Sequence, residues 1–108
     1  MNALRIVATL FALAVWITTP MAAADGDIDA GKIKASTCTG CHGSEAYKNI
    51  YPTYSVPKLR GQSASYIAVA LKAYRSGERA HPTMRAQAGS MSDNDIADIA
   101  AYISSLEK

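Results

Sequence analysis

The segment Cys38-Thr39-Gly40-Cys41-His42 contains the only two cysteines of this 108-residue chain. Two thiols three positions apart lie on one turn of a helix, where they can add to the two vinyl groups of a porphyrin. The histidine that follows can then ligate iron at the centre of the ring. C-x-x-C-H is the attachment signature of a c-type haem. The sequence therefore predicts one covalent haem c, held by Cys38 and Cys41, with His42 as an iron ligand.

Two other uses of the cysteine pair fit the sequence less well. A thioredoxin-type dithiol is expected to follow a strand in a βαβ unit, whereas the segment 29–37 has a helical pattern without strand alternation. A structural zinc ion needs four ligands. The chain offers His81 in addition to the motif, but the adjacent Cys41 and His42 are poorly spaced for one tetrahedral ion. Haem attachment is the preferred interpretation.

The first 24 residues are expected to be a signal peptide that is removed. Arg5 precedes an apolar run over residues 6–17, and Ala22 and Ala24 provide small residues for cleavage before Asp25. That order is typical of a secretory signal. The alternative is a membrane anchor, but the run of about 12 residues is shorter than the roughly 20 that span a bilayer. We expect residues 25–108 to form a periplasmic domain without stable membrane insertion.

Composition and charge indicate one small globular domain. Apolar residues make up 49% of the chain and charged residues 19%, which is not the composition of a disordered tail. The 11 basic and 9 acidic residues form no basic block, so the sequence gives no support for nucleic-acid binding. A domain this small buries a modest fraction of its surface and is often stabilised by a cofactor.

Three downstream residues are candidates for the second axial ligand of the iron: Met84, Met91 and His81. Met91 precedes Ser92, a favourable N-cap, and can pair with Ile96 in a hydrophobic staple. Met84 has no such packing role. It lies in a proline-containing loop between two expected helices, from which its thioether can turn toward the iron. Met84 is the predicted ligand, and Met91 and His81 are the alternatives; His81 is otherwise expected to be an exposed loop residue.

Three helices are expected. The first runs from about Asp27 to Thr37 and leads into Cys38. The second runs from about Ala64 to Ser76, where an apolar stripe of helical spacing lies between a candidate N-cap, Ser63, and a glycine that can end the helix. The third, from Ser92 to about Leu106, has apolar residues at i, i+3, i+4 and i+7. With no strand pattern of useful length, an all-α fold around one haem is predicted.

Two further features bear on packing. Gly31 and Ala35 leave a smooth groove on the first helix, in which Tyr102 of the third helix can lie.

Residues 43–62 form a long connection, and such connections in small domains are usually functional. Three tyrosines lie in it: Tyr47, Tyr51 and Tyr54. We expect these rings to cover the haem. The alternative is an interface with a permanent partner, because tyrosine is enriched at protein contacts.

Taken together, these residues resemble a small class I c-type cytochrome, and more closely a monohaem relative of the periplasmic dihaem cytochromes c. The resemblance covers nearly all of the chain after the expected signal peptide. It rests on the order of five segments: 38–43, 57–62, 74–79, 82–84 and 92–102. The resemblance implies a small class I cytochrome c fold, with three main helices wrapped around one haem.

The resemblance also implies roles for single residues. The two cysteines would hold the haem, and His42 and Met84 would be the axial ligands. Pro57 would accept a hydrogen bond from Nδ1–H of His42, which fixes the tautomer and the ring plane. Leu59 would pack on the haem, and Tyr102 would lie where the first and last helices cross. Arg60, Arg79 and Arg85 are all candidates to pair with a haem propionate, and nothing local selects among these three.

With both axial positions filled, the iron has no open site for substrate or oxygen but can still pass one electron. We therefore expect a periplasmic one-electron carrier, a monomer or weak dimer, and not an enzyme. Its partners would be redox proteins bound briefly through small interfaces. One alternative is a permanently bound electron-transfer subunit of an exported dehydrogenase or oxidase complex. Another is a gas-binding or peroxidase haem protein, which needs a missing or displaceable second ligand.

Overall fold

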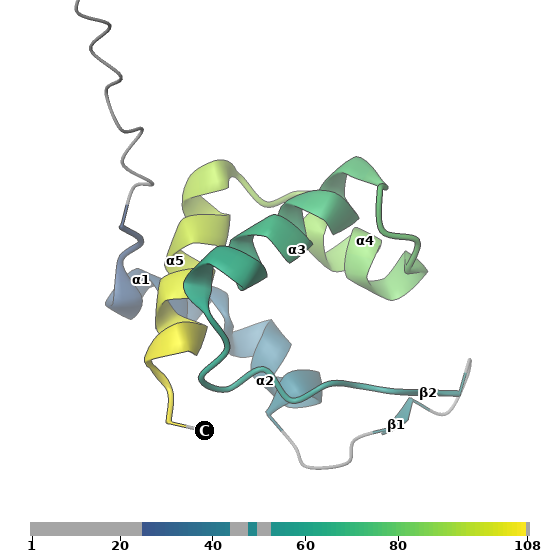
Figure 1. The fold of residues 1–108 in the computed structure, drawn as a ribbon, viewed down its shortest axis with the longest axis horizontal. Helices are drawn as coiled ribbons and strands as arrows, with labels where there is room; N and C mark the ends of the chain where they lie inside the picture. The colour runs from purple at the N-terminus through teal and green to yellow at the C-terminus, as the bar shows by residue number, and fades with distance from the viewer. Residues whose placement is uncertain (1–24, 44–47, 50–52, 108) are drawn as a thin grey trace, which may run out of the picture.

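The computed structural model describes residues 25–43, 48–49 and 53–107 (Figure 1). The expected signal peptide, residues 1–24, lies outside these residues, and so do Tyr47 and Tyr51. The described part contains α1 (Ile28–Lys34), α2 (Ser36–His42), β1 (Lys48–Asn49), β2 (Tyr54–Ser55), α3 (Ala64–Ser76), α4 (Pro82–Ala88) and α5 (Asp93–Ser105). Helices dominate, as the sequence predicts. Within these ranges, no helix has the length and apolar character needed to cross a membrane.

The first expected helix is divided into two. The side chain of Asp27 accepts a hydrogen bond from the backbone N–H of Ala30 and caps α1. The helix then stops at Ala35, which is completely buried, and α2 begins at the next residue. The expectation of a single helix was wrong: alanine is the strongest helix former, so residue 35 gives no local signal for the break that the structure has there. The break gives the haem-attachment motif a short helix of its own.

The second and third expected helices form as predicted. The hydroxyl of Ser63 accepts a hydrogen bond from the backbone N–H of Tyr66, and α3 ends at Gly77, which has a φ of 88°. Before α5, Ser92 and Asp95 form a capping box in which each side chain accepts a hydrogen bond from the other residue's backbone N–H. Each helix begins after a serine whose side chain caps it, Ser63 for α3 and Ser92 for α5. Such a cap is a local signal, which is why the sequence predicts where both helices begin.

The segment expected to be a loop around Met84 is instead α4. Pro82 occupies its first turn, and Nδ1 of His81 accepts a hydrogen bond from the backbone N–H of Met84 at 3.3 Å. His81 is half-buried rather than an exposed loop residue. The proline at the first helical position is a local signal for such a start. A helix of seven residues is too short to be stable alone, however, so tertiary packing determines whether it forms.

The strands β1 and β2 form a minimal antiparallel ladder, in which Lys48 pairs with Ser55 and Asn49 with Tyr54. Two residues in each strand are too few to show an alternating pattern, so the sequence could not predict them. The ladder leaves the fold class unchanged. It brings Tyr54 to the start of the segment that leads to Pro57 and Leu59.

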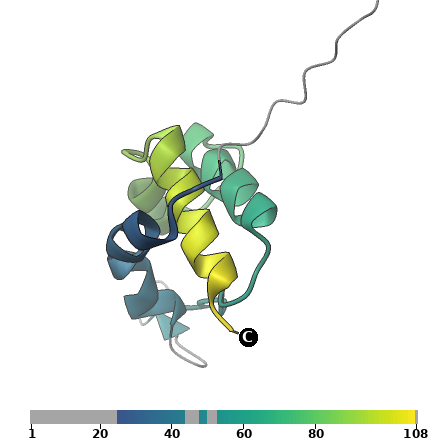
Figure 2. The ribbon, with the colours of Figure 1, turned by 90° about the vertical axis from the view of Figure 1, so that its left-hand side faces the viewer.

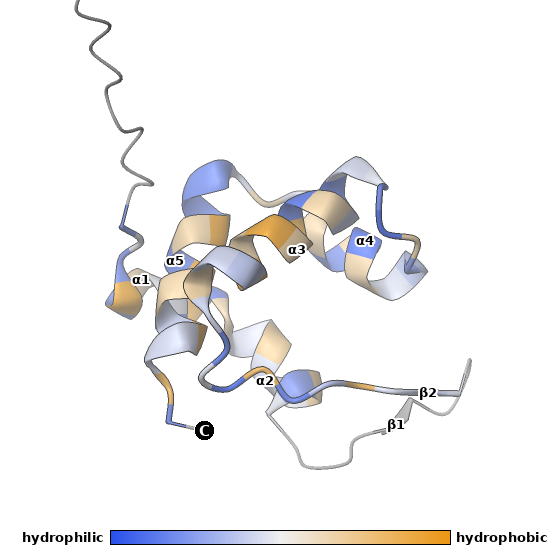
Figure 3. Ribbon diagram, in the orientation of Figure 1, coloured by the Kyte–Doolittle hydropathy of each residue, from blue (hydrophilic) through white to orange (hydrophobic). Residues whose placement is uncertain are grey.

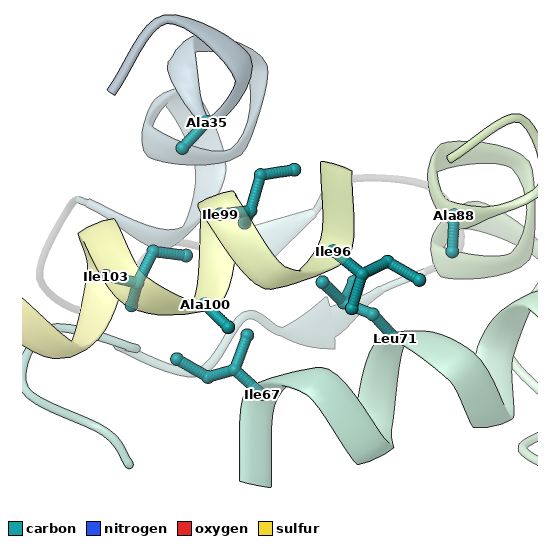
Figure 4. Close-up of a cluster of buried hydrophobic side chains, with 8 residues drawn as sticks. All are labelled: Ala35, Ile67, Leu71, Ala88, Ile96, Ile99, Ala100 and Ile103. Atoms are coloured by element: carbon teal, nitrogen blue, oxygen red, sulfur yellow. The ribbon is translucent and has the colours of Figure 1, made fainter. Parts of the chain in front are cut away.

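The hydrophobic core lies around α5 (Figure 4). Its buried members are Ala35, Ile67, Leu71, Ala88, Ile96, Ile99, Ala100 and Ile103. Figure 4 shows the side chains of Ile67 and Leu71 on α3 beside those of α5. In Figure 3, apolar residues recur along α3 and α5, whereas the first turn of α5 is polar. The periodic apolar stripes of the sequence therefore become the contact between these two helices.

The helices α1 and α5 pack closely against each other (Figures 1 and 2). Gly31 is buried, and a Cβ atom added there would collide with the carbonyl oxygen of Asp98 and lie 2.8 Å from Cβ of Tyr102. The predicted packing of Tyr102 beside Gly31 is confirmed. Nζ of Lys34 also lies 2.9 Å from Oδ1 of Asp95 and 2.6 Å from Oδ2 of Asp98. The first and last helices are thus joined by close backbone approach and by ion pairs.

Candidate cofactor site

The attachment motif borders a cavity of about 280 Å³. Cys38 and His42 are half-buried and Cys41 is exposed, and all three lie on α2 and line this cavity. The two cysteines do not form a disulfide with each other. Burial raises the pKa of the Cys38 thiol above its ordinary value, because a thiolate loses hydration there. Two unbridged cysteines on one helical turn at a cavity wall fit thioether attachment of a porphyrin.

The rest of the cavity wall comes from elements that are distant in the sequence. Its lining residues come from α2, α3, α4 and α5, and Figure 1 shows how these helices are arranged. Apolar side chains form much of the wall, among them Leu59, Ile67, Leu71, Ile99 and Ile103. Such a lining suits a flat apolar ring, and the same lining also includes a histidine nitrogen and methionine sulfurs that can bind iron. The residues present therefore fit a haem.

The imidazole of His42 is oriented by the backbone of the segment after β2. Its Nδ1 lies 2.7 Å from the carbonyl oxygen of Pro57, in the arrangement that the family resemblance implies. A carbonyl oxygen only accepts hydrogen bonds, so Nδ1 carries the proton and Nε2 keeps its lone pair. Nε2 is the nitrogen that can bind a metal. Leu59, two residues after Pro57, lines the cavity as well.

All three candidates for the second axial ligand border the same cavity. Met84 does so from α4, Met91 from the turn before α5, and His81 from the N-terminal end of α4. The His81 ring contacts two tyrosine rings edge-on, with its centroid 4.9 Å from that of Tyr54 and 6.1 Å from that of Tyr74. Its Nδ1 is occupied by the N–H of Met84. Met91 therefore stays a candidate ligand, even though it was expected to pack against Ile96 in a hydrophobic staple.

The sequence predicts that Tyr54 and Arg79 belong to the site, but it gives no signal for the contacts that they make there. The hydroxyl of Tyr54 donates a hydrogen bond to Oγ1 of Thr83 at 3.0 Å, and both residues line the cavity. Arg79 lines it too, with its guanidinium carbon 4.5 Å from the centroid of the Tyr74 ring. Of the three arginines that the sequence left open, Arg60 borders a smaller neighbouring pocket. These contacts join different elements, and no local pattern reports them.

The zinc alternative needs the two cysteines, His42 and His81 to converge. In the part of the chain that the structure describes, no group of three or more histidine, cysteine or acidic side chains is arranged to hold a metal ion. The donors of the attachment motif instead share a wall with apolar side chains. The geometry favours a large apolar cofactor over a structural ion.

Comparison with known proteins identifies the family. The family model for cytochrome c matches residues 28–107. The chain belongs to the cytochrome c family. The prediction of a class I c-type cytochrome with an all-α fold is confirmed. Cytochromes c carry electrons between redox partners through a covalently bound haem c and are not enzymes, so these general features extend to this cytochrome c.

Two relatives and one solved structure show how far the similarity extends. This cytochrome c is 47% identical over 85 residues to cytochrome c-554(548) of Halomonas halodenitrificans, an alignment covering 76% of this chain and 99% of the relative. It is 38% identical over 87 residues to cytochrome c4 of Pseudomonas aeruginosa, covering 81% of this chain and 42% of the relative. The crystal structure of reduced recombinant cytochrome c4 from Pseudomonas stutzeri matches with a TM-score of 0.59 and 30% identity, covering 74% and 48% of the two chains. This cytochrome c spans less than half of each cytochrome c4.

Proposed function

We propose that this cytochrome c is an exported one-electron carrier in which His42 and Met84 are the axial ligands of a single haem. The observation that supports this most directly is that one cavity is bordered by both cysteines, by His42 and by Met84. When bound, a haem supplies a one-electron couple. A histidine–methionine ligand pair raises its potential relative to two imidazoles. Two protein ligands also leave no position for a substrate.

The residues around the cavity have separate tasks in this proposal. The carbonyl of Pro57 accepts the hydrogen bond from Nδ1–H of His42, so Nε2 would be the nitrogen that holds the iron. The apolar wall, including Leu59 and Ile103, excludes water from the ring faces. Among the described residues that line the cavity, Arg79 is the only arginine or lysine, so we assign it to a haem propionate. These groups orient the cofactor and set its surroundings; none of them transfers a proton or a covalent group.

The number of haems follows from the thiols. Each haem c uses two cysteines in C-x-x-C-H, and this chain has two cysteines in total. We therefore propose one haem for this chain.

The expected signal peptide leads us to propose a periplasmic protein whose mature N-terminus is Asp25. N-terminal sequencing of the exported protein tests that boundary.

Visible spectra of the exported protein in both oxidation states test the proposal. We expect the spectrum of a c-type haem with both axial positions occupied, and a denatured pyridine derivative typical of two thioether links. The reduced, undenatured protein should not bind carbon monoxide readily. A colourless protein after correct maturation would contradict haem attachment. Ready binding of carbon monoxide would instead indicate an open or weakly held axial position, as in the gas-binding and peroxidase alternatives.

A free carrier and a fixed subunit differ in size under native conditions. We propose the free carrier, because the tyrosine described in the connection, Tyr54, borders the cavity. Size-exclusion chromatography of the native periplasmic fraction should show the haem absorbance at the size of a monomer or small dimer. Elution of all of the haem in one large complex would support the permanently bound subunit.

A further inference from the structure

Tyr54 makes two contacts with the start of the helix that carries Met84. Its hydroxyl donates a hydrogen bond to Oγ1 of Thr83 at 3.0 Å, and its ring meets the ring of His81 edge-on at 4.9 Å. These two partners flank Pro82, and they are 27 and 29 residues away from Tyr54 in the chain. Tyr54 is half-buried and borders the cavity. The ring is thus held at the cavity wall and is turned toward α4.

The same short segment also holds the other end of the proposed ligand pair. Pro57, three residues after Tyr54, accepts the hydrogen bond from Nδ1 of His42 at 2.7 Å. Residues 54–57 therefore touch α4 at one end and the His42 ring at the other. The two ligand-bearing helices, α2 and α4, are connected through this segment by two hydrogen bonds.

Met84 depends on such contacts because α4 is short. The helix has seven residues, and Met84 is the third of them. An isolated helix of this length is not stable in water. Its first turn is held by the His81 cap and by the contacts of Tyr54, while α3 supports it from the other side. Release of Tyr54 from Thr83 should let the first turn of α4, with the Met84 sulfur, open more often.

We propose that Tyr54 is a positioning residue that fastens the His42-bearing side of the site to the first turn of α4 and so holds the Met84 sulfur in place. This inference rests on the proposed ligation by Met84. It also assigns one tyrosine of the 43–62 connection to the cofactor site rather than to a partner interface. Tyr54 itself does not bind the metal in this proposal.

Imidazole binding to the oxidised holoprotein tests the role. Imidazole can occupy the axial position only in molecules whose sulfur has moved away, so its apparent affinity reports how often the site opens. Tyr54→Phe removes the hydroxyl and keeps the ring. The loss of one hydrogen bond should tighten apparent imidazole binding by about three- to tenfold. Thr83→Val, which removes the same bond from the other side, should have the same effect even if Tyr54→Phe does not mature.

Two comparisons separate the proposal from a general loss of stability. The double variant Tyr54→Phe with Thr83→Val should bind imidazole no more tightly than either single variant, because both remove one shared contact. Tyr102→Phe, which removes a phenolic hydroxyl at the α1–α5 crossing, should leave imidazole binding unchanged. If Tyr54 had a merely structural role, Tyr54→Phe would lower the denaturation midpoint without changing the imidazole affinity, and that result would overturn the proposal.

The ligand assignment is checked separately with Met84→Ala. If this variant keeps the far-red sulfur–iron band, the proposed ligation fails, and with it the basis of the inference. If the band disappears in Met84→Ala while imidazole binds Tyr54→Phe and Thr83→Val as it binds the parent protein, the ligation stands and only the positioning role of Tyr54 is overturned.

Discussion

Met84, Met91 and His81 all border the cavity that holds the attachment motif, so proximity alone does not select the second axial ligand. The surroundings of the three residues differ. His81 uses Nδ1 to cap α4 and is flanked by two tyrosine rings, and Met91 lies at the turn where its carbonyl oxygen accepts a hydrogen bond from Arg75 at 2.8 Å. Met84 lies in the first turn of α4, which Tyr54 and His81 hold in place. Its thioether remains the predicted ligand.

Substitution of Met84 tests this assignment at the level of one atom. Met84→Ala should abolish the far-red sulfur–iron charge-transfer band of the oxidised protein, because no thioether is left at that position. Met91→Ala should keep the band. The measurement is an absorption spectrum of each purified, oxidised holoprotein.

A histidine ligand is tested by a third variant. His81→Asn keeps a good helix cap and removes the imidazole, so the far-red band should persist in it. If Met91→Ala loses the band and Met84→Ala keeps it, Met91 is the ligand. If the parent protein has no such band, a nitrogen ligand such as His81 is favoured.

At the scale of helices, α1 and α5 depend on a close approach and on a small charge network. The approach requires the missing side chain of Gly31, since any Cβ atom there would collide with the backbone of α5. The charges require Lys34, which lies between Asp95 and Asp98. Asp98 also accepts a hydrogen bond from the backbone N–H of Asp27 at 2.8 Å. The N-terminal helix is therefore fastened at both of its ends.

Gly31→Ala should weaken this helix pair. The added methyl group must push α1 away from α5, which typically costs about 1–3 kcal/mol of the free energy of unfolding. Gly40→Ala is the matched control, because a Cβ atom there meets nothing within 4 Å. Denaturant titration of the holoproteins, followed by far-ultraviolet circular dichroism, measures both. Equal stability of Gly31→Ala and the parent protein would contradict the close packing of these helices.

The charge network should make stability depend on acid pH. The hydrogen bonds from Lys34 are the main reason that the pKa values of Asp95 and Asp98 lie below the usual range, and they raise the pKa of Lys34. Carboxylates with lowered pKa values stabilise the fold fully above their unfolded pKa of about 4. That contribution is lost as the pH falls through the lower values of the folded state.

Replacing Lys34 tests this dependence. Lys34→Met should be less stable than the parent at pH 7 and should lose less stability between about pH 4 and pH 2, where the parent carboxylates become protonated. The remaining bonds from Ser92 to Asp95 should preserve part of the slope. Lys32→Met is the control, because Lys32 is exposed on the same helix and forms no ion pair with another described residue. A parallel acid profile for Lys34→Met and the parent protein would rule out the assigned cause.

At the scale of the whole domain, the core is small and the cavity is large beside it. Eight residues form the buried cluster, and three of these are alanines. Several of the larger members, Ile67, Leu71, Ile99 and Ile103, also line the cavity of about 280 Å³. A cofactor would therefore complete the apolar interior, in keeping with the small size of the domain.

Removal of the attachment sites should accordingly prevent stable folding. In the double variant Cys38→Ala with Cys41→Ala, the cavity wall loses its covalent cofactor and apolar surface stays in contact with water. We expect no cooperative thermal transition in differential scanning calorimetry, because the stabilisation by the bound group is lost. Met84→Ala, which keeps both cysteines, should retain a cooperative transition at a lower temperature. A cooperative transition in the cysteine-free variant would show that the polypeptide folds without the cofactor.

Local signals in the sequence were sufficient for the attachment motif and for two of the helices. The C-x-x-C-H spacing depends on one helical turn, the capping box on Ser92 and Asp95, and the end of α3 on Gly77 in a left-handed conformation. Each of these involves residues within five positions of one another. The interactions involved lie within a single turn of the chain, so they can be predicted without knowing which other element that turn packs against.

Tertiary structure decided the features that join distant parts of the chain. The break at Ala35 and the formation of α4 depend on packing, since neither segment has enough local stability to choose one conformation. The contacts of Tyr54 with Thr83 and of Lys34 with Asp98 span 29 and 64 residues. Contacts over such separations form only when the helices pack in one particular arrangement. Local patterns of residue types do not predict that arrangement.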